Sequence, residues 1–246
     1  MKFIILADGS PEIGLGHIMR TSVIAEELIK RDYEVIYITK IEKLHWTYNR
    51  LKKIGIKSFI SDLEDYKPNA SQDILIIDSY LLPITQFEIK RERWKKVIAI
   101  VDEASPNYDA DINIIPSLIG RSGIEFKTNL ISGPEYALIR KGIAKREYND
   151  KSKNIPQKIL VAGGGTDINN FSRKNALAID KLNIPVEVNF ITNDRFVSKS
   201  DSDFIFHPLG SDIDKLAEQT DVAITTASTL SHEFIAREIP IGIVCV

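Results

Sequence analysis

The segment IGLGHIMR, residues 13–20, places a histidine between a short apolar run and a longer amphipathic segment. Gly14 and Gly16 permit the tight turn with which a strand passes into a helix. An imidazole exchanges a proton near neutral pH, so His17, presented at the mouth of a cleft, is a candidate general base. Arg20 follows three residues later on the same face of the predicted helix, where its guanidinium can face an anion. Alternatively, His17 merely caps or packs the junction.

The same segment resembles the beginning of a dinucleotide-binding fingerprint, but Met19 occupies the position of the third glycine. The next predicted strand, EVIYITK, ends in Thr39 and Lys40 instead of the acidic residue that binds a ribose. The segment therefore argues against NAD binding.

A second glycine-rich segment, VAGGGTDINN at residues 161–170, follows another apolar run. Gly164, Gly165 and Thr166 lie at a predicted helix start, where backbone N–H groups and the helix dipole favour anions. The segment has no Gly-Lys-Ser/Thr, so it is not a Walker A loop and ATP hydrolysis is not expected. A plain glycine turn with an Asp167 cap is the alternative.

A third segment, TTASTLSHEF at residues 225–234, crowds hydroxyl groups at another predicted strand-to-helix junction. The hydroxyls belong to Thr225, Thr226, Ser228 and Thr229. Glu233 follows in the first turns of the helix, where a carboxylate can accept hydrogen bonds from the paired hydroxyls of a ribose. A well-capped helix with a solvated Glu233 is the alternative.

Acidic residues also end two predicted strands of the first half of the chain. Asp78 precedes Ser79 and Tyr80, and Asp102 precedes Glu103. Each carboxylate is either a helix cap or a substrate contact. No spacing of His, Asp and Glu typical of a metal site is present, so neither a metal nor another cofactor is expected.

The composition excludes several classes of protein. Of the 246 residues, 43% are hydrophobic and 27% charged, as in ordinary globular proteins. The net charge of −2 implies no basic face for nucleic acid, and the run KRERWKK (90–96) is expected on a solvated helix face. One cysteine, Cys245, excludes a disulfide framework. No apolar run is long enough for a signal sequence or membrane span, so we expect a cytoplasmic protein without stable membrane insertion.

Apolar runs of strand length alternate with segments of helical period along the whole chain, which predicts parallel sheets with right-handed crossovers. Strands are expected at 2–8, 34–39, 57–60, 73–80, 96–103, 111–117, 157–162, 186–192, 204–207, 221–228 and 241–246, and helices at 16–31, 44–53, 84–94, 169–182, 212–219 and 229–239. We expect an α/β protein with two Rossmann-like lobes, residues 1–140 and 157–246, joined by a polar linker, residues 141–156. Ligands of open α/β sheets bind at the carboxyl ends of the strands, so a cleft between the lobes is the expected site.

Taken together, these segments resemble the PseG family, UDP-sugar hydrolases of pseudaminic acid biosynthesis with the two-lobed GT-B fold of MurG-like glycosyltransferases. IGLGHIMR resembles the family's Ile-Gly-x-Gly-His-x-x-Arg signature, and GGGTDINN resembles its Gly-Gly-x-Asp phosphate loop. IIDSY, PEYALIR and ASTLSHE resemble its Asp-x-Tyr strand end, its Tyr-Ala-Leu-Ile-Arg segment and its last nucleotide loop. The resemblance covers nearly the whole chain.

The resemblance implies metal-free hydrolysis of a UDP-linked 2,4-diacetamido-2,4,6-trideoxy sugar. By that analogy His17 and Tyr80 are catalytic, with His17 the base that activates water. The sugar side of the substrate would be bound by Gly14, Gly16, Arg20 and Asp78. UDP would be bound in the second lobe by Gly164, Gly165, Thr166, Ser228, Thr229, Leu230 and Glu233, with Arg140 as a further contributor.

The chain departs from the family at two places. It stops at PIGIVCV, inside a predicted strand, where the family continues, so the second lobe is expected to be incomplete. Glu103 also stands where relatives often carry a second Asp. Two other functions remain open: a glycosyltransferase in which His17 activates an acceptor hydroxyl, and a non-catalytic nucleotide-sugar binding subunit.

Overall fold

The computed structural model describes residues 1–10, 13–39, 45–81, 91–102, 108–116, 129–140 and 156–245. The chain divides into two compact units, one of Met1–Ile13 and His17–Leu138 and the other of Gly14–Gly16 and Ile139–Val246. Of the predicted linker only Pro156 is described. Residues 84–90 of a predicted helix and Glu103 also lie outside the described residues.

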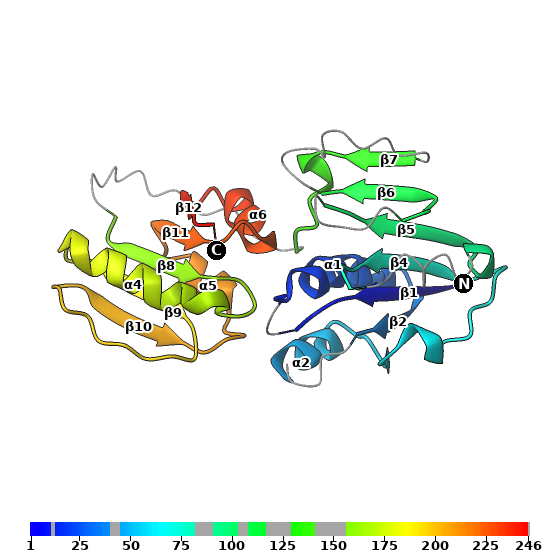
Figure 1. Ribbon diagram of the computed structural model, residues 1–246, viewed down its shortest axis with the longest axis horizontal. Coiled ribbons are helices and arrows are strands. Elements are labelled where there is room, and N and C mark those ends of the chain that lie inside the picture. Colours follow the sequence, from blue (N-terminus) through cyan, green and yellow to red (C-terminus); the bar gives the residue numbers. More distant parts are fainter. Residues whose placement is uncertain are drawn as a thin grey trace. The chain divides into compact units, whose positions relative to one another are not determined.

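The described part of the first unit contains a parallel sheet with the strand order β3-β2-β1-β4-β5-β6-β7, which can be followed in Figure 1. The strands are β1 (Lys2–Ala7), β2 (Glu34–Ile38), β3 (Ser58–Ile60), β4 (Ile74–Asp78), β5 (Lys96–Ile100), β6 (Ile112–Ile115) and β7 (Asn129–Ser132). The helices are α1 (Gly16–Lys30) and α2 (His45–Lys53), with 3-10 turns at Leu63–Asp65, Arg91–Arg93 and Pro134–Tyr136.

The central strands of this sheet are buried along almost their whole length. Residues 3–7 of β1 and all of β4 are buried, which explains their continuous apolar sequences. One apolar cluster joins residues of β1, β2, β4 and β5 to Trp94 and Tyr108. This packing makes the carboxyl ends of β1 and β4 a rigid base for the side chains that follow them.

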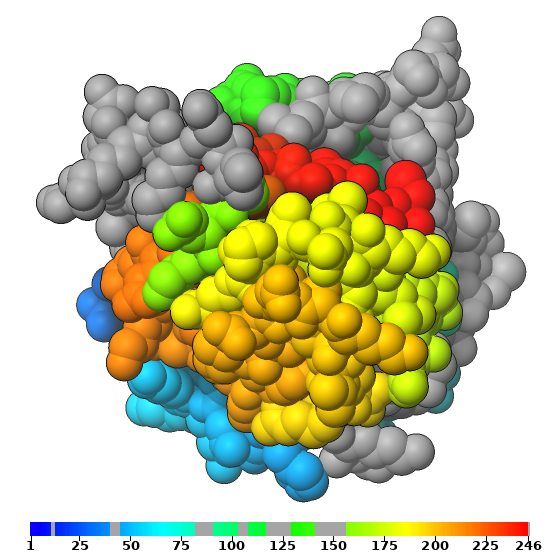
Figure 2. Space-filling model, turned by 90° about the vertical axis from the view of Figure 1, so that its left-hand side faces the viewer, coloured from blue at the N-terminus to red at the C-terminus, as the bar shows by residue number. Residues whose placement is uncertain are grey.

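The second unit has a parallel sheet with the order β10-β9-β8-β11-β12. Its strands are β8 (Lys158–Ala162), β9 (Glu187–Ile191), β10 (Asp203–His207), β11 (Val222–Thr225) and β12 (Ile241–Ile243). Its helices are α4 (Phe171–Leu182), α5 (Ile213–Ala217) and α6 (Thr229–Ala236), with a 3-10 turn at Ile168–Asn170. Figure 2 shows α4, coloured yellow, on the surface of this unit.

Strand β8 is buried on both faces of the second sheet. Ile159 and Val161 pack into one apolar cluster, while Leu160 and Ala162 pack into another. Since successive side chains of a strand point to opposite faces, the two clusters lie on opposite sides of the sheet.

Both sheets follow the Rossmann order, with the reversal between β1 and β4 in the first unit and between β8 and β11 in the second. The predicted α/β class with two parallel-sheet lobes is confirmed. In such sheets ligands bind outside the carboxyl ends of the strands at the point of reversal. No helix formed by the described residues has the length and apolar character needed to cross a membrane.

Candidate functional site

The carboxyl ends of β1, β4 and β5 bring together a polar cluster in the first unit. Asp78 is the last residue of β4 and is 0% exposed. Its Oδ1 lies 2.5 Å from Nδ1 of His17, in the first turn of α1. The hydroxyl of Tyr37 on β2 donates to the carbonyl of Ile18, and the hydroxyl of Thr21 donates to the carbonyl of His17. These hydrogen bonds fix the first turn of α1, which carries the imidazole. The sequence therefore identified two residues that the fold pairs.

The contact with Asp78 determines which nitrogen of His17 can act as a base. A carboxylate only accepts hydrogen bonds, so we assign the proton to Nδ1. The lone pair is then on Nε2, the nitrogen available to take a proton from another molecule. Arg20 Nη2 lies 3.4 Å from the same Nδ1, a longer contact between two donors that does not change this assignment.

Arg20 forms a bidentate ion pair with Asp78. Its Nε donates to Asp78 Oδ2 and its Nη2 donates to Asp78 Oδ1, both at 2.5 Å. Its Nη1 and Nη2 also donate to Asp102 Oδ2, at 3.3 and 3.2 Å. Burial by itself lowers the pKa of Arg20, but Asp78 and Asp102 raise it above its ordinary value overall. Both charges are thus paired within the protein, and the predicted substrate contacts of Arg20 and Asp78 stay predictions.

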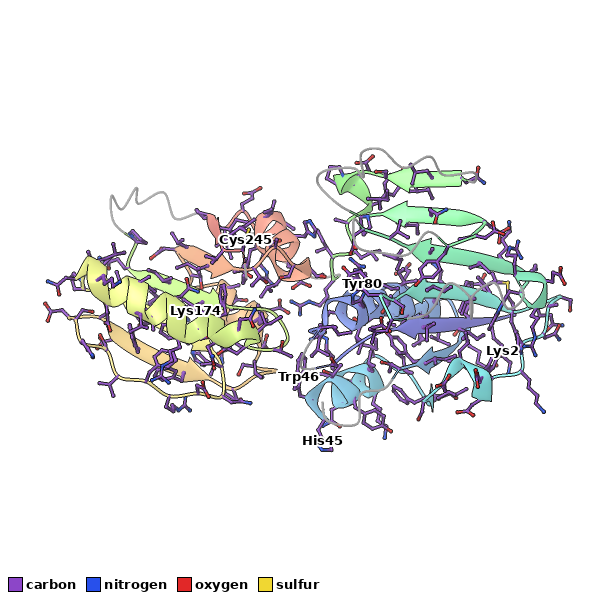
Figure 3. All side chains as sticks on the ribbon, viewed as in Figure 1. Lys2, His45, Trp46, Tyr80, Lys174 and Cys245 are labelled. Atoms are coloured by element: carbon purple, nitrogen blue, oxygen red, sulfur yellow. The ribbon has the colours of Figure 1, made fainter. Side chains whose placement is uncertain are left out.

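Tyr80 packs directly against His17. The ring centroids are 4.2 Å apart with the planes at 90°, and the Tyr80 hydroxyl donates to Asp102 Oδ2 at 2.6 Å. Burial and this hydrogen bond raise the pKa of Tyr80 above its ordinary value. Tyr80 is therefore a neutral hydroxyl donor at physiological pH. Figure 3 shows it beside α1, far from Lys2 at the amino end of β1.

The exposure of the imidazole differs from our expectation. A histidine at the mouth of a cleft would be open to solvent, whereas His17 is 4% exposed and Tyr80, which lies against it, is 37% exposed. Sequence reasoning also missed Asp8, whose carboxylate binds the backbone that carries Tyr80. The available signal was an acidic residue directly after the first buried strand.

In the second unit, a glycine turn follows β8. Gly164 has φ +107°, a left-handed conformation that favours glycine, and Gly165 leaves room for Leu15, since a Cβ there would lie 2.6 Å from Leu15 Cβ. Asp167 accepts from the Ser172 amide at 2.9 Å and the Thr192 hydroxyl at 2.7 Å. Asp167 therefore holds the turn to α4, and the anion-binding role of the glycine turn stays a prediction.

A second strand-to-helix junction lies beside the glycine turn, between β11 and α6. The Thr226 hydroxyl donates to the Gly163 carbonyl at 3.3 Å and so connects the two segments. Ser228 occupies the N-cap of α6, and within the described part of the chain its buried hydroxyl has no partner. Thr229 Oγ1 lies 3.5 Å from the carbonyl of Gly16. The glycine turn and the start of α6 with the Ser228 hydroxyl thus lie side by side, and backbone amides at a helix start favour anions.

Gly14, Thr166 and Leu230 are further predicted residues, one from each of the three segments that the sequence singled out. Gly14 has φ +81°, and a Cβ there would meet no atom within 4 Å. Thr166 is 8% exposed. Leu230 packs in an apolar cluster of the second sheet, so a ligand contact with it would involve its backbone.

Glu233 is buried and paired with Arg140. Arg140 Nε and Nη2 donate to its two oxygens at 2.6 and 2.7 Å, and the carboxylate side chain is 8% exposed. The alternative of a solvated Glu233 is therefore wrong. Asp214 contacts Arg140 at 3.1 Å and also pairs with Arg237. Burial alone lowers the pKa of Arg140, but Glu233 and Asp214 raise it overall.

Each unit holds one polar arrangement with its own chemical character. The first unit has an imidazole oriented by a buried carboxylate, and the second has amide-rich turns next to a buried Arg–Glu pair. Among the residues that the structure describes, no group of three or more His, Cys, Asp and Glu is placed to hold a metal ion.

No family model matches the chain. A similar curated protein is an uncharacterized protein of Methanocaldococcus jannaschii, 29% identical, with 98% of this chain and 55% of that protein covered. UDP-2,4-diacetamido-2,4,6-trideoxy-beta-L-altropyranose hydrolase of Campylobacter jejuni is 26% identical, with 75% of this chain and 68% of that protein covered. Spore coat polysaccharide biosynthesis protein SpsG of Bacillus subtilis is 26% identical, with 72% of this chain and 55% of that protein covered. The chain thus spans about half the length of two of these relatives.

Several solved structures resemble this chain over nearly its whole length. Acinetobacter baumannii MurG has a TM-score of 0.52 at 13% identity, with 100% of this chain and 79% of that chain covered. CalG4, the calicheamicin glycosyltransferase, has a TM-score of 0.57 at 12% identity, with 99% of this chain and 80% of that chain covered. S. aureus MnaA, solved with UDP, has a TM-score of 0.51 at 14% identity, with 98% of this chain and 79% of that chain covered. Together with the two parallel sheets, these likenesses give the chain a GT-B-like fold.

Proposed function

We propose that the chain is a nucleotide-sugar hydrolase that releases UDP from a UDP-linked 2,4-diacetamido-2,4,6-trideoxy sugar. It would act in pseudaminic acid type biosynthesis of surface polysaccharides. The observation that carries the proposal is the 2.5 Å contact between His17 Nδ1 and the buried Asp78, since it prepares Nε2 to act as a base. The similarity to a hydrolase of such a substrate and to a polysaccharide biosynthesis protein supports it.

In the proposed reaction, His17 Nε2 takes a proton from water as the water oxygen attacks the anomeric carbon. The bond between that carbon and the diphosphate oxygen breaks, and UDP leaves with the electron pair. The imidazolium of His17 is stabilised by Asp78 and later loses its proton to solvent. The His17 side chain is only 5% exposed, so this reaction requires Nε2 to become accessible to the attacking water when the substrate binds.

The second unit would stabilise the leaving group. Charge develops on the diphosphate as the bond breaks, and amides at the turn 163–165 and at the start of α6 are donors suited to such charge. The unpartnered hydroxyl of Ser228 in the described structure provides a further donor. Glu233 would bind the ribose only if its pairing with Arg140 rearranges, because both of its oxygens accept from that guanidinium.

A glycosyltransferase is the second candidate, favoured by the likeness of the fold to the calicheamicin glycosyltransferase. The same base would then take its proton from an acceptor hydroxyl instead of water. The two candidates share His17 and the nucleotide site and differ only in the nucleophile.

The test is UDP release from the UDP-activated diacetamido sugar with EDTA present and no acceptor. We expect release by the unchanged protein and a loss of about 100-fold or more in His17→Ala, with UDP binding by calorimetry retained. His207→Ala is the matched control, because His207 is also hydrogen-bonded but lies on β10. Turnover only with an acceptor would identify a transferase, and UDP binding without turnover would identify a binding subunit.

A further inference from the structure

Asp8 is the first residue after β1 and adjoins the end of β4. Its amide donates to the carbonyl of Asp78 at 3.2 Å, which extends the pairing of the two central strands by one residue. The side chain of Asp8 therefore begins at the point where the strand order reverses, next to the pair of His17 and Asp78.

One oxygen of the Asp8 carboxylate binds the chain that leaves β4. Oδ2 accepts from the Ser79 hydroxyl at 2.8 Å, from the Tyr80 amide at 2.6 Å and from the Leu81 amide at 2.9 Å. The Leu81 amide also lies 3.2 Å from Ser79 Oγ, and the Tyr108 hydroxyl donates to the Ser79 carbonyl at 2.9 Å. Two consecutive amides thus converge on one charged acceptor, a strong arrangement for fixing a backbone.

This backbone determines where the Tyr80 ring lies. With its amide bound to Asp8, Tyr80 directs its ring onto His17 and its hydroxyl onto Asp102. Tyr80 is 37% exposed, so the surrounding packing alone restrains the ring incompletely. The hydrogen bonds that the Asp8 carboxylate accepts from this backbone add to that restraint.

We propose that Asp8 is a positioning residue that holds the segment 79–81 and thereby keeps the Tyr80 ring against His17. It touches no reacting atom and acts through Tyr80. Its effect on the placement of the ring is independent of the reaction, whereas its effect on turnover rests on the proposed function.

The test compares the imidazole signals of His17 in proton–carbon NMR spectra of the unchanged protein and of three variants. Tyr80→Leu removes the aromatic ring and defines the His17 signal without its ring current. Asp8→Ala is expected to move the signal in the same direction. Asp73→Ala is the matched control, because the Asp73 carboxylate accepts from the Tyr66 hydroxyl and the Asn69 amide, both at 2.8 Å, outside the cluster around His17.

Two further variants separate positioning from a general loss of structure. Asp8→Asn keeps an acceptor oxygen and is expected to retain most of the wild-type His17 signal. In the Tyr80→Leu background, Asp8→Ala is expected to move that signal no further, since the two residues act through one contact. A folded Asp8→Ala protein with the His17 signal unmoved would overturn the proposal, as would an equal displacement of the signal in Asp73→Ala.

The kinetic arm depends on the proposed function. Asp8→Ala is expected to lower kcat for UDP release about 10- to 100-fold with a smaller change in KM, because it misplaces a group beside the base. A wild-type protein that releases no UDP would overturn the proposed function, while the NMR comparison would still decide whether Asp8 places Tyr80.

Discussion

Asp78 binds two side chains of different chemical character with its two oxygens. One oxygen contacts the His17 imidazole and both accept from Arg20, so a single buried carboxylate orients the imidazole and neutralises a cation. Removing one partner of a buried ion pair leaves the other charge uncompensated, which typically costs about 3–5 kcal/mol. The structural role of Asp78 and the orienting role that we propose for it are therefore coupled.

Asp78→Asn should lower the rate of UDP release strongly. An amide no longer requires the proton to stay on His17 Nδ1, so Nε2 is no longer kept ready as the base, and a loss of about 100- to 10,000-fold is expected. Single-turnover UDP release and nitrogen NMR shifts of His17 measure the rate and the tautomer. Asp180→Asn is the control, since that carboxylate binds the hydroxyls of Ser198 and Ser200 in the second unit. A folded Asp78→Asn enzyme with the wild-type rate would rule out the orienting role.

The residue types at this site could be predicted from the sequence, but their pairing could not. His17 and Asp78 are 61 residues apart, and they meet because β4 pairs with β1. The sequence placed Arg20 and Asp78 as separate substrate contacts. Nothing in a linear pattern indicates that two such charges satisfy each other.

At the scale of elements, buried strands were the most predictable feature. Continuous apolar runs marked β1, β4 and β8 because central parallel strands are buried on both faces. Strand β7 was missed, since its first two residues are exposed at the edge of the sheet. Strand β4 also ends at Asp78 instead of residue 80, because the next amides bind the Asp8 carboxylate instead of a neighbouring strand.

Gly164→Ala should weaken UDP binding. A Cβ at this position would meet no atom within 4 Å, so the cost comes from the backbone, whose φ is +107°. An L-residue pays about 1–2 kcal/mol there, and relaxation of the turn would misdirect its amides. We expect about tenfold weaker UDP binding by calorimetry, which corresponds to about 1.4 kcal/mol.

The control for this variant is Gly55→Ala, which carries a similar φ of +104° in the first unit, between α2 and β3. It should lose stability and keep the wild-type affinity for UDP. Equal affinities for UDP in Gly164→Ala and the unchanged protein would show that the glycine turn does not hold the diphosphate.

At the scale of the whole molecule, aromatic residues are distributed unevenly between the two units. Both tryptophans, Trp46 and Trp94, belong to the first unit. Burial raises the pKa of Tyr37 and of Tyr108, and both also belong to this unit. Tryptophan emission therefore reports the unfolding of the same unit whose buried tyrosines resist ionisation.

The first unit should lose stability steeply above about pH 10. Unfolded tyrosines ionise near pH 10, whereas Tyr37 and Tyr108, 0% and 3% exposed, keep their protons when folded. The folded state then binds more protons, so this stabilisation is full below about pH 10 and falls by about 1.4 kcal/mol per pH unit for each tyrosine above it. Urea unfolding followed by the tryptophan emission wavelength between about pH 9 and pH 11 measures the fall.

The variant with Tyr37→Phe and Tyr108→Phe should be less stable at neutral pH, since the carbonyls of Ile18 and Ser79 lose their donors, yet its stability should fall less steeply. If the double variant lost stability with the same slope above about pH 10, the alkaline sensitivity would come from other groups.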